Sequence, residues 1–137
     1  MGGRRAVASV LSALLLDTHA WAWSLTDDPR LSEAARRAIG SAGVVYVSPI
    51  TFYEIAQKVR LGKWPEMAPH IEALPDLLLQ QGGHAARFDP AVCTLAGAMD
   101  WAHRDPFDRL IAATAILDRL TLVSTDPAFD GVLRRLW

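Results

Sequence analysis

Four acidic residues stand where they could act together on a phosphate group. Asp17 and Asp126 each end a short apolar run that is typical of a buried strand, and Glu54 and Asp108 lie early in two segments with helical periodicity. Clustered carboxylate oxygens suit Mg²⁺ or Mn²⁺, which hold phosphate oxygens and activate water. If the four side chains meet, they predict metal-assisted chemistry at a phosphate.

Such a cluster would be costly as structure alone. Two unit charges about 4 Å apart repel by about 4 kcal/mol at an effective dielectric near ~20, so converging carboxylates strain a fold unless a cation offsets them. The chain has no Gly-rich phosphate loop of either common kind, and its four histidines lack zinc-ligand spacing. The pattern therefore favours an all-oxygen site for a hard divalent cation.

Each acid also has an ordinary structural interpretation. Asp17 could cap a turn that starts at Thr18, and Asp126, which precedes a proline, could cap a short final helix. Glu54 could pair with Lys58, four residues later, on a solvated helix face. Spacing alone leaves these interpretations open beside the metal-site hypothesis.

Two neighbouring acids, Asp105 and Asp108, have to be told apart. Asp105 precedes Pro106 and is predicted to cap the following helix, with Asp108 three residues later answering as in a capping box. The role of Asp108 stays open, because Ala112 and Ala115 on its side of the helix leave room for close packing and little else.

The elements that must position these acids are short strands alternating with helices. Strands are expected at residues 14–16, 44–47 and 120–124, with a weaker candidate at 85–88 and an edge strand at 132–137. Helices are expected at 33–39 after Ser32, from Pro49 after Ser48 to a stop at Gly62, at 75–81, at 90–99 and from Pro106. This order implies an α/β fold with a mostly parallel sheet covered on both faces, whose ligands gather at the carboxyl ends of the strands.

Length and composition indicate one domain. A chain of 137 residues with 51% hydrophobic residues can build a single core. The formal charge of −1, from 14 Lys and Arg against 15 Asp and Glu, gives no overall field that would attract a polyanion, so nucleic acid would need local cationic patches. The single cysteine, Cys93, is predicted to be a small core residue and is compatible with a reducing cytoplasm.

The first residues imitate a secretion signal, because Arg4 and Arg5 precede the apolar run 6–16. No small-residue cleavage site separates that run from Asp17, and the run is too short to span a bilayer. We therefore expect a frayed or misassigned leader at 1–12, a domain at 13–137 and no membrane association.

Four segments carry a pattern that extends over nearly the whole chain. They are residues 14–21, residues 54–58 together with 61–63, residues 103–113 and residues 122–129. Together, and in this order, they resemble the PIN-domain ribonucleases, specifically the VapC-type toxins of toxin–antitoxin pairs. The chain departs from that pattern in a strand at 84–88 that is poor in branched residues and in a final strand that Arg134 and Arg135 interrupt.

The resemblance implies a PIN-domain α/β/α sandwich that cleaves RNA phosphodiester bonds with Mg²⁺, or alternatively Mn²⁺. It assigns the acidic roles to Asp17, Glu54, Asp108 and Asp126, with Asp105 as an accessory acid and Thr125 as a metal-site hydroxyl. It also implies a cognate VapB-type antitoxin, a homodimer and a cytoplasmic location.

On this basis Asp17, Asp108 and Asp126 are the predicted metal residues. Asp17 and Asp108 are expected to hold the ion directly, while Glu54 and Asp126 complete its shell through water or orient the attacking water. The cations nearest the motifs are candidates for contacts to the RNA backbone, although each could equally be a solvated surface residue: Lys58, Lys63, Arg104 and Arg109. Four tryptophans could stack bases or, more simply, fill the core or a dimer interface: Trp21, Trp23, Trp64 and Trp101.

Three other functions compete with this hypothesis. A structure-specific DNA nuclease could use the same acids, but the chain lacks room for the helical elements that gate flap substrates. A catalytically silent module that binds RNA or a partner would need no acids, so the intact set argues against it. A haloacid-dehalogenase phosphatase would need a second acid two residues after Asp17, where His19 stands.

Overall fold

A five-stranded, fully parallel sheet forms the centre of the molecule. The computed structural model describes residues 12–137, so residues 1–11, most of the predicted leader, lie outside the described residues. The strand order is β3-β2-β1-β4-β5, with β1 in the middle. The strands are β1 Ala13–Leu16, β2 Val44–Val47, β3 His84–Ala85, β4 Thr121–Val123 and β5 Arg135–Leu136.

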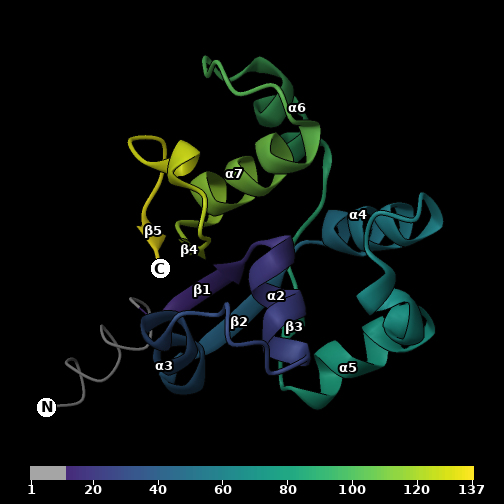
Figure 1. Cartoon of the computed structure of the whole chain (residues 1–137). Helices are drawn as coiled ribbons and strands as arrows, with labels where there is room; N and C mark the ends of the chain where they lie inside the picture. Colours follow the sequence, from purple (N-terminus) through teal and green to yellow (C-terminus); the bar gives the residue numbers. More distant parts are fainter. Residues whose placement is uncertain (1–11) are drawn as a thin grey trace, which may run out of the picture.

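Helices connect the strands and cover both faces of the sheet (Figure 1). The α-helices are α2 Thr18–Leu25, α3 Glu33–Ser41, α4 Pro49–Arg60, α5 Leu74–Gln80, α6 Pro90–Ala98 and α7 Pro106–Asp118. Two 3₁₀ segments, η1 Pro65–Ala73 and η2 Pro127–Phe129, complete the described chain. None of the helices within residues 12–137 is long and apolar enough to cross a membrane.

The central strand β1 shows why the sheet must be covered twice. Successive side chains of a strand point to opposite faces. Leu14 and Leu16 pack into a core cluster built mainly with α2, α4 and α5, whereas Leu15 packs into a second cluster with Ile111 of α7 and Leu122 of β4. Helices on both sides bury these clusters, which confirms the expected α/β/α sandwich.

Local sequence signals fix where the helices that follow β2 and α2 begin. Ser48 caps α4 by accepting a hydrogen bond from the Ile50 N–H at 3.2 Å, and Ser32 caps α3 in the same way from Ala35 at 3.0 Å. Gly62, which has a φ of 73°, follows the end of α4 in a left-handed conformation that suits glycine. These predicted signals are confirmed, and they place Glu54 in the second turn of α4, beside the carboxyl end of β2.

Several expectations differ from the structure. The segment after Asp17 is a two-turn helix, α2, where only a turn was expected, and η1 was not predicted. The strand expected at 85–88 is reduced to β3, because a single edge strand needs only a short pairing with β2. Cys93 is exposed rather than buried, since α6 turns Val92 and Ala96 toward α7 instead.

Candidate metal centre

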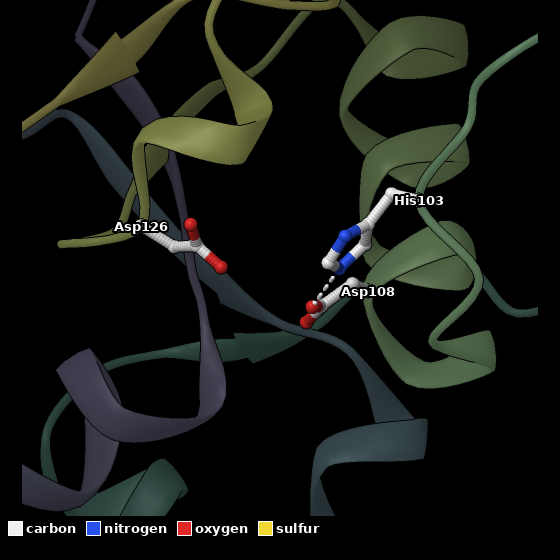
Figure 2. Close-up of side chains that lie close together, drawn as sticks. All are labelled: His103, Asp108 and Asp126. Carbon is white, nitrogen blue, oxygen red and sulfur yellow. Dashed lines mark hydrogen bonds and ion pairs between the residues drawn. The ribbon is translucent and has the colours of Figure 1, made fainter.

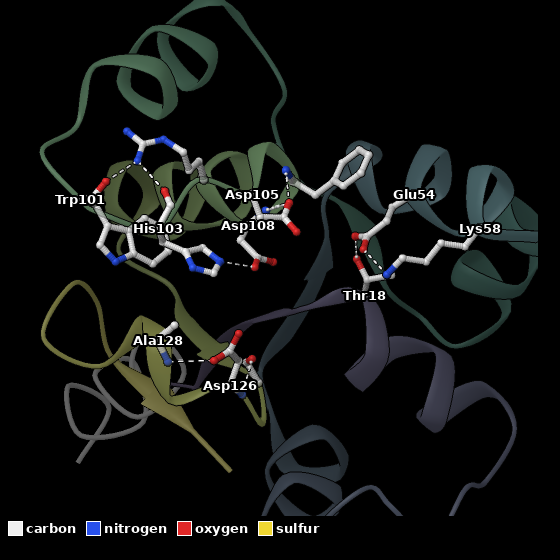
Figure 3. Close-up of polar contacts among 12 residues, drawn as sticks. Thr18, Glu54, Lys58, Trp101, His103, Asp105, Asp108, Asp126 and Ala128 are labelled. Carbon is white, nitrogen blue, oxygen red and sulfur yellow. Dashed lines mark hydrogen bonds and ion pairs between the residues drawn. The ribbon is translucent and has the colours of Figure 1, made fainter. Parts of the chain in front are cut away.

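The predicted acids meet at the carboxyl edge of the sheet. The Asp17 N–H continues the strand pairing by donating to the Val123 carbonyl at 3.0 Å, so the ends of β1 and β4 lie side by side. Helices α4 and α7 bring Glu54 and Asp108 to the same edge (Figure 3). The side chains enclose a cavity of about 340 Å³ that is lined by Asp17, Thr18, His19, Glu54, Lys58, Asp105, Asp108, Thr125, Asp126 and Phe129.

Asp17 is both a helix cap and a cavity residue. Its Oδ1 accepts a hydrogen bond from the Ala20 N–H at 2.8 Å, which caps α2. Only 8% of the residue is exposed, and this burial raises the pKa of Asp17 to about 6. Hydrogen bonds from the Ser124 side chain and the Ala20 N–H oppose that rise in pKa, whereas the charges of Asp108 and Glu54 add to it.

Asp126 is likewise both a helix cap and a cavity residue. Its Oδ1 accepts from the Ala128 N–H at 2.9 Å and so caps η2, as the following proline indicated. Its own N–H donates to Ser124 Oγ at 3.1 Å. Because the fully buried Ser124 contacts Asp17 and Asp126 alike, one side chain links the acids of two neighbouring strands.

Glu54 forms the predicted pair with Lys58, with Nζ and Oε2 2.8 Å apart, but not on a solvated face. The residue is only 6% exposed, and its Oε1 accepts a hydrogen bond from Thr18 Oγ1 at 2.6 Å. Thr18 Oγ1 also lies 3.1 Å from Thr51 Oγ1. The Glu54 carboxylate is therefore held at both oxygens and faces the cavity.

Asp105 and Asp108 separate clearly in the structure. Asp105 Oδ1 accepts from the N–H groups of Phe107 at 2.8 Å and Asp108 at 3.3 Å, which is the predicted cap of α7. The Asp108 carboxylate contacts His103 instead, with Nε2 and Oδ2 2.6 Å apart. Burial raises the pKa of Asp108, and the hydrogen bond from His103 opposes this increase.

One histidine that the sequence analysis left without a role lies in the cluster. His103, Asp108 and Asp126 each offer one ligand atom, and these atoms all lie within 4.8 Å of one another (Figure 2). The sequence-based prediction named only carboxylates and did not include this imidazole. Zinc-ligand spacing could not reveal His103, but its place five residues before Asp108 in the 103–113 segment could have drawn attention to it.

The candidate RNA-contact residues fall into three groups. Lys58 lines the cavity, and Arg104 and Lys63 are exposed residues outside its lining. Arg109 instead donates four hydrogen bonds to backbone carbonyls, one to Ala96 at the end of α6 and three to residues of the α6–α7 connection: Met99, Trp101 and His103. These contacts give Arg109 a structural role, and its predicted contact with RNA stays a prediction.

The tryptophans pack mostly as structural residues. Trp21 is fully buried and donates from Nε1 to Gln81, and Trp64 is 9% exposed and stacks on His19. Trp101 packs against His103 with 4.8 Å between ring centroids. Base stacking is therefore not needed to explain their presence.

Negative charge dominates the cavity. Five of its lining residues are acidic, and Lys58, its one lysine, is bonded to Glu54. Two of the acids, Asp17 and Asp108, have a raised pKa because burial disfavours their charged forms. A divalent cation would reverse that balance, so this donor set fits the cation predicted from the sequence.

Comparison with known proteins agrees with this geometry. The family model described as "PIN domain" matches residues 14–133. The chain is 35% identical over 122 residues to Ribonuclease VapC22 of Mycobacterium tuberculosis, covering 85% of this chain and 88% of that protein.

Solved structures share the fold at low sequence identity. A toxin–antitoxin complex from Klebsiella pneumoniae aligns with a TM-score of 0.65 and 19% identity over 90% of this chain and 96% of the other. VapBC2 from Rickettsia felis, bound to a promoter DNA fragment, aligns with a TM-score of 0.64 and 18% identity over 90% of this chain and 97% of the other. FitAcB from Neisseria gonorrhoeae aligns with a TM-score of 0.63 and 24% identity over 90% of this chain and 96% of the other.

Proposed function

This chain belongs to the PIN-domain family, and we propose that it is a metal-dependent ribonuclease of the VapC type, the toxin of a toxin–antitoxin pair. One observation carries the proposal: four acids from four separate segments line a single cavity at the carboxyl edge of the sheet. The named ribonuclease relative covers most of the chain and supports RNA as the substrate.

We assign the binding of a divalent cation, Mg²⁺ or Mn²⁺, to Asp17, Asp108 and Asp126. The fit rests on their oxygen donors and on the burial that leaves Asp17 and Asp108 poorly compensated. When bound, such a cation lowers the pKa of a water molecule and stabilises charge on a phosphate.

The remaining polar residues orient groups around the acids. Thr18 and Lys58 fix both oxygens of Glu54, so we assign Glu54 to orienting the attacking water and accepting its proton. Asp105 serves the site indirectly, because it fixes the first turn of α7, which carries Asp108. Thr125 lies at the cavity and is proposed as an accessory hydroxyl.

The RNA backbone would approach along the exposed cations near the cavity. Lys58 lies in the cavity wall, and Arg104 immediately precedes the cap residue of α7. Lys63 lies in the turn that ends α4. Phosphate contacts of this kind set affinity rather than sequence preference.

Three further properties belong to the proposal. A VapB-type antitoxin is the expected partner, since two of the structural neighbours are described as toxin–antitoxin or VapBC assemblies. We also propose a homodimer and a cytoplasmic location, where the exposed thiol of Cys93 would stay reduced.

A cleavage assay tests the proposal against its alternatives. The full chain is incubated with RNA or single-stranded DNA of the same sequence, with Mg²⁺ and then with excess EDTA. RNA cleavage that EDTA abolishes is expected. Binding of RNA without cleavage would instead support a catalytically silent module, and preferential cleavage of branched DNA would support a structure-specific DNA nuclease.

A further inference from the structure

His103 has the most constrained environment of the histidines at or near the site. Its Nε2 lies 2.6 Å from Oδ2 of Asp108. Its ring packs on Trp101, with 4.8 Å between centroids and planes inclined by 32°, and lies 6.5 Å from the ring of Phe129. The imidazole therefore packs beside two aromatic rings. One of its nitrogens points at the Asp108 carboxylate (Figure 2).

The backbone of His103 is fixed from the same helix that carries Asp108. Arg109 Nη1 donates to the carbonyls of His103 at 2.8 Å and Trp101 at 2.7 Å. Its Nη2 and Nε donate to Met99 at 2.6 Å and Ala96 at 2.8 Å. Helix α7 therefore contacts His103 through two consecutive residues: Asp108 meets its imidazole, and Arg109 binds the backbone of its loop. Figure 3 shows the His103 imidazole directed toward Asp108.

We propose that His103 is a positioning residue for Asp108: its Nε2–H donates to Oδ2 and leaves the other carboxylate oxygen for the cation. This inference rests on the proposed function, because it concerns the same metal centre. A carboxylate on a helix can rotate among several orientations, and a fixed donor on one oxygen selects one of them. Partners of this kind commonly change metal affinity by about 10- to 100-fold when they are removed.

Direct ligation of the cation by His103 is a different arrangement. An imidazole nitrogen that donates a proton to a carboxylate cannot offer a lone pair to a metal at the same time. The 2.6 Å contact between Nε2 and Oδ2 therefore favours a hydrogen-bond donor over a ligand. The two arrangements differ in which substitutions they tolerate.

The experiment compares three variants of the full chain. His103→Gln keeps an N–H donor of similar reach but is a poor ligand for transition metals, whereas His103→Ala removes the donor. His84→Ala is the control, because His84 is an exposed histidine on edge strand β3. The dissociation constant for Mn²⁺ is measured by calorimetry, and RNA cleavage is followed in parallel.

We expect His103→Ala to weaken Mn²⁺ binding by about tenfold or more. His103→Gln should restore most of that affinity, and His84→Ala should match the wild type. Thermal unfolding in EDTA checks that each variant folds. A purely structural role would lower the melting temperature of His103→Ala without changing its affinity for Mn²⁺.

Three results would overturn the inference. Equal Mn²⁺ affinity in wild type and His103→Ala would show that Asp108 needs no positioning. Loss of affinity in His103→Gln as severe as in His103→Ala would show that the nitrogen is a ligand. If the wild type itself bound no Mn²⁺ or Mg²⁺, the proposed metal-dependent function would fail, and His103 with it.

Discussion

The two edges of the parallel sheet each carry a cavity, and the two cavities differ in size and in charge. At the amino edge lies a cavity of about 700 Å³, lined by Ala13, Gly43, Val44, Tyr46, Arg87, Asp118 and Leu120. At the carboxyl edge the acidic cavity is about half as large, at about 340 Å³. Size alone would select the amino edge, where none of the predicted site residues lies.

The distribution of charge favours the carboxyl edge instead. At the amino edge Arg87 forms ion pairs of 3.3 Å with both Asp89 and Asp118, and all three side chains are about a third exposed or more. At the carboxyl edge buried acids outnumber the cations, and the pKa of both Asp17 and Asp108 is raised. A site that binds a cation is recognised by charge left uncompensated, and that feature strains the protein in the absence of the ligand.

The largest expected effect is on catalysis, at Asp17. Asp17→Asn keeps the shape and the cap of α2 but removes a metal-holding charge, so RNA cleavage should fall by about a hundredfold or more. Asp118→Asn at the amino edge is the matched control and should cleave at the wild-type rate. Steady-state cleavage of one RNA oligonucleotide measures both, and normal activity of Asp17→Asn would remove that residue from the site.

Two acids at the start of α7, Asp105 and Asp108, are expected to differ in their effect on activity. Asp105→Asn should keep measurable activity, because Asn caps helices as well as Asp does. Asp108→Asn should lose it, since Asp108 faces the cavity and contacts His103. Cleavage rates of the two variants under identical Mg²⁺ check this ranking. The reverse order would mean that cap and ligand are assigned to the wrong residues.

Much of this arrangement could be predicted from the sequence because it depends on local rules. Apolar runs of three or four residues gave β1, β2 and β4, and the caps at Ser32 and Ser48 gave the start of two helices. The carboxyl-edge rule for parallel sheets then placed Asp17 and Asp126 together.

The contacts that the sequence could not predict depend on the conformation of the folded chain and not on a regular spacing, whether the partners are 5 or 36 residues apart. Glu54 and Lys58 pair as their spacing indicated, but burial of the pair depends on Thr18, 36 residues away. Arg109 was predicted to contact RNA because it is a cation near a motif, and only the folded loop reveals four carbonyls around its guanidinium. His103 was missed because its contact with Asp108 depends on the side-chain conformation of Asp108, which residue spacing does not reveal.

Stability in the absence of metal should change with pH because of Asp17. Its pKa rises from the ordinary value of 3.8 to about 6 on folding, so the folded protein binds this proton more tightly than the unfolded chain. The resulting stabilisation is complete below pH 3.8 and is lost as the pH rises through about 6. At about 1.4 kcal/mol for each pKa unit, this amounts to about 3 kcal/mol.

Urea unfolding in EDTA between pH 4 and pH 7 measures this contribution. The wild type should lose more unfolding free energy over that range than Asp17→Asn, and the difference between the two isolates Asp17 from the other titrating groups. Asp118→Asn at the amino edge should follow the wild-type curve. Parallel curves for the wild type and Asp17→Asn would mean that the carboxyl edge is not strained.

A comparable effect is expected when the cation is added. In EDTA, Asp108→Asn should be more stable than the wild type, because it removes one charge from a poorly compensated cluster. Mg²⁺ at about 100 times its dissociation constant should then stabilise the wild type by about 2.7 kcal/mol and the variant much less. The variant should therefore have the higher melting temperature in EDTA, and the wild type should have the higher one in Mg²⁺. Failure of Mg²⁺ to shift either curve would argue that the acids are caps and surface charges.

The smallest effect on stability is expected at the amino edge, where the ion pairs are exposed to water. Arg87→Gln breaks two ion pairs whose side chains are 39%, 42% and 32% exposed. Pairs this accessible to water contribute about 0–1 kcal/mol, because solvent screens the charges and the long side chain regains freedom when released. Urea unfolding should thus show a loss of at most about 1 kcal/mol, while RNA cleavage and Mn²⁺ affinity stay unchanged.

The matching substitution at the carboxyl edge is Lys58→Gln. Its partner Glu54 has a side chain only 7% exposed, so removing the cation leaves a buried carboxylate that loses its donor at Oε2 and keeps Thr18 at Oε1. Unfolding free energy in EDTA should fall further for Lys58→Gln than for Arg87→Gln, because a buried charge cannot turn to water for compensation. If instead Arg87→Gln were the more damaging change, or reduced cleavage, the larger cavity would have a role of its own, and uncompensated charge would no longer identify the functional edge.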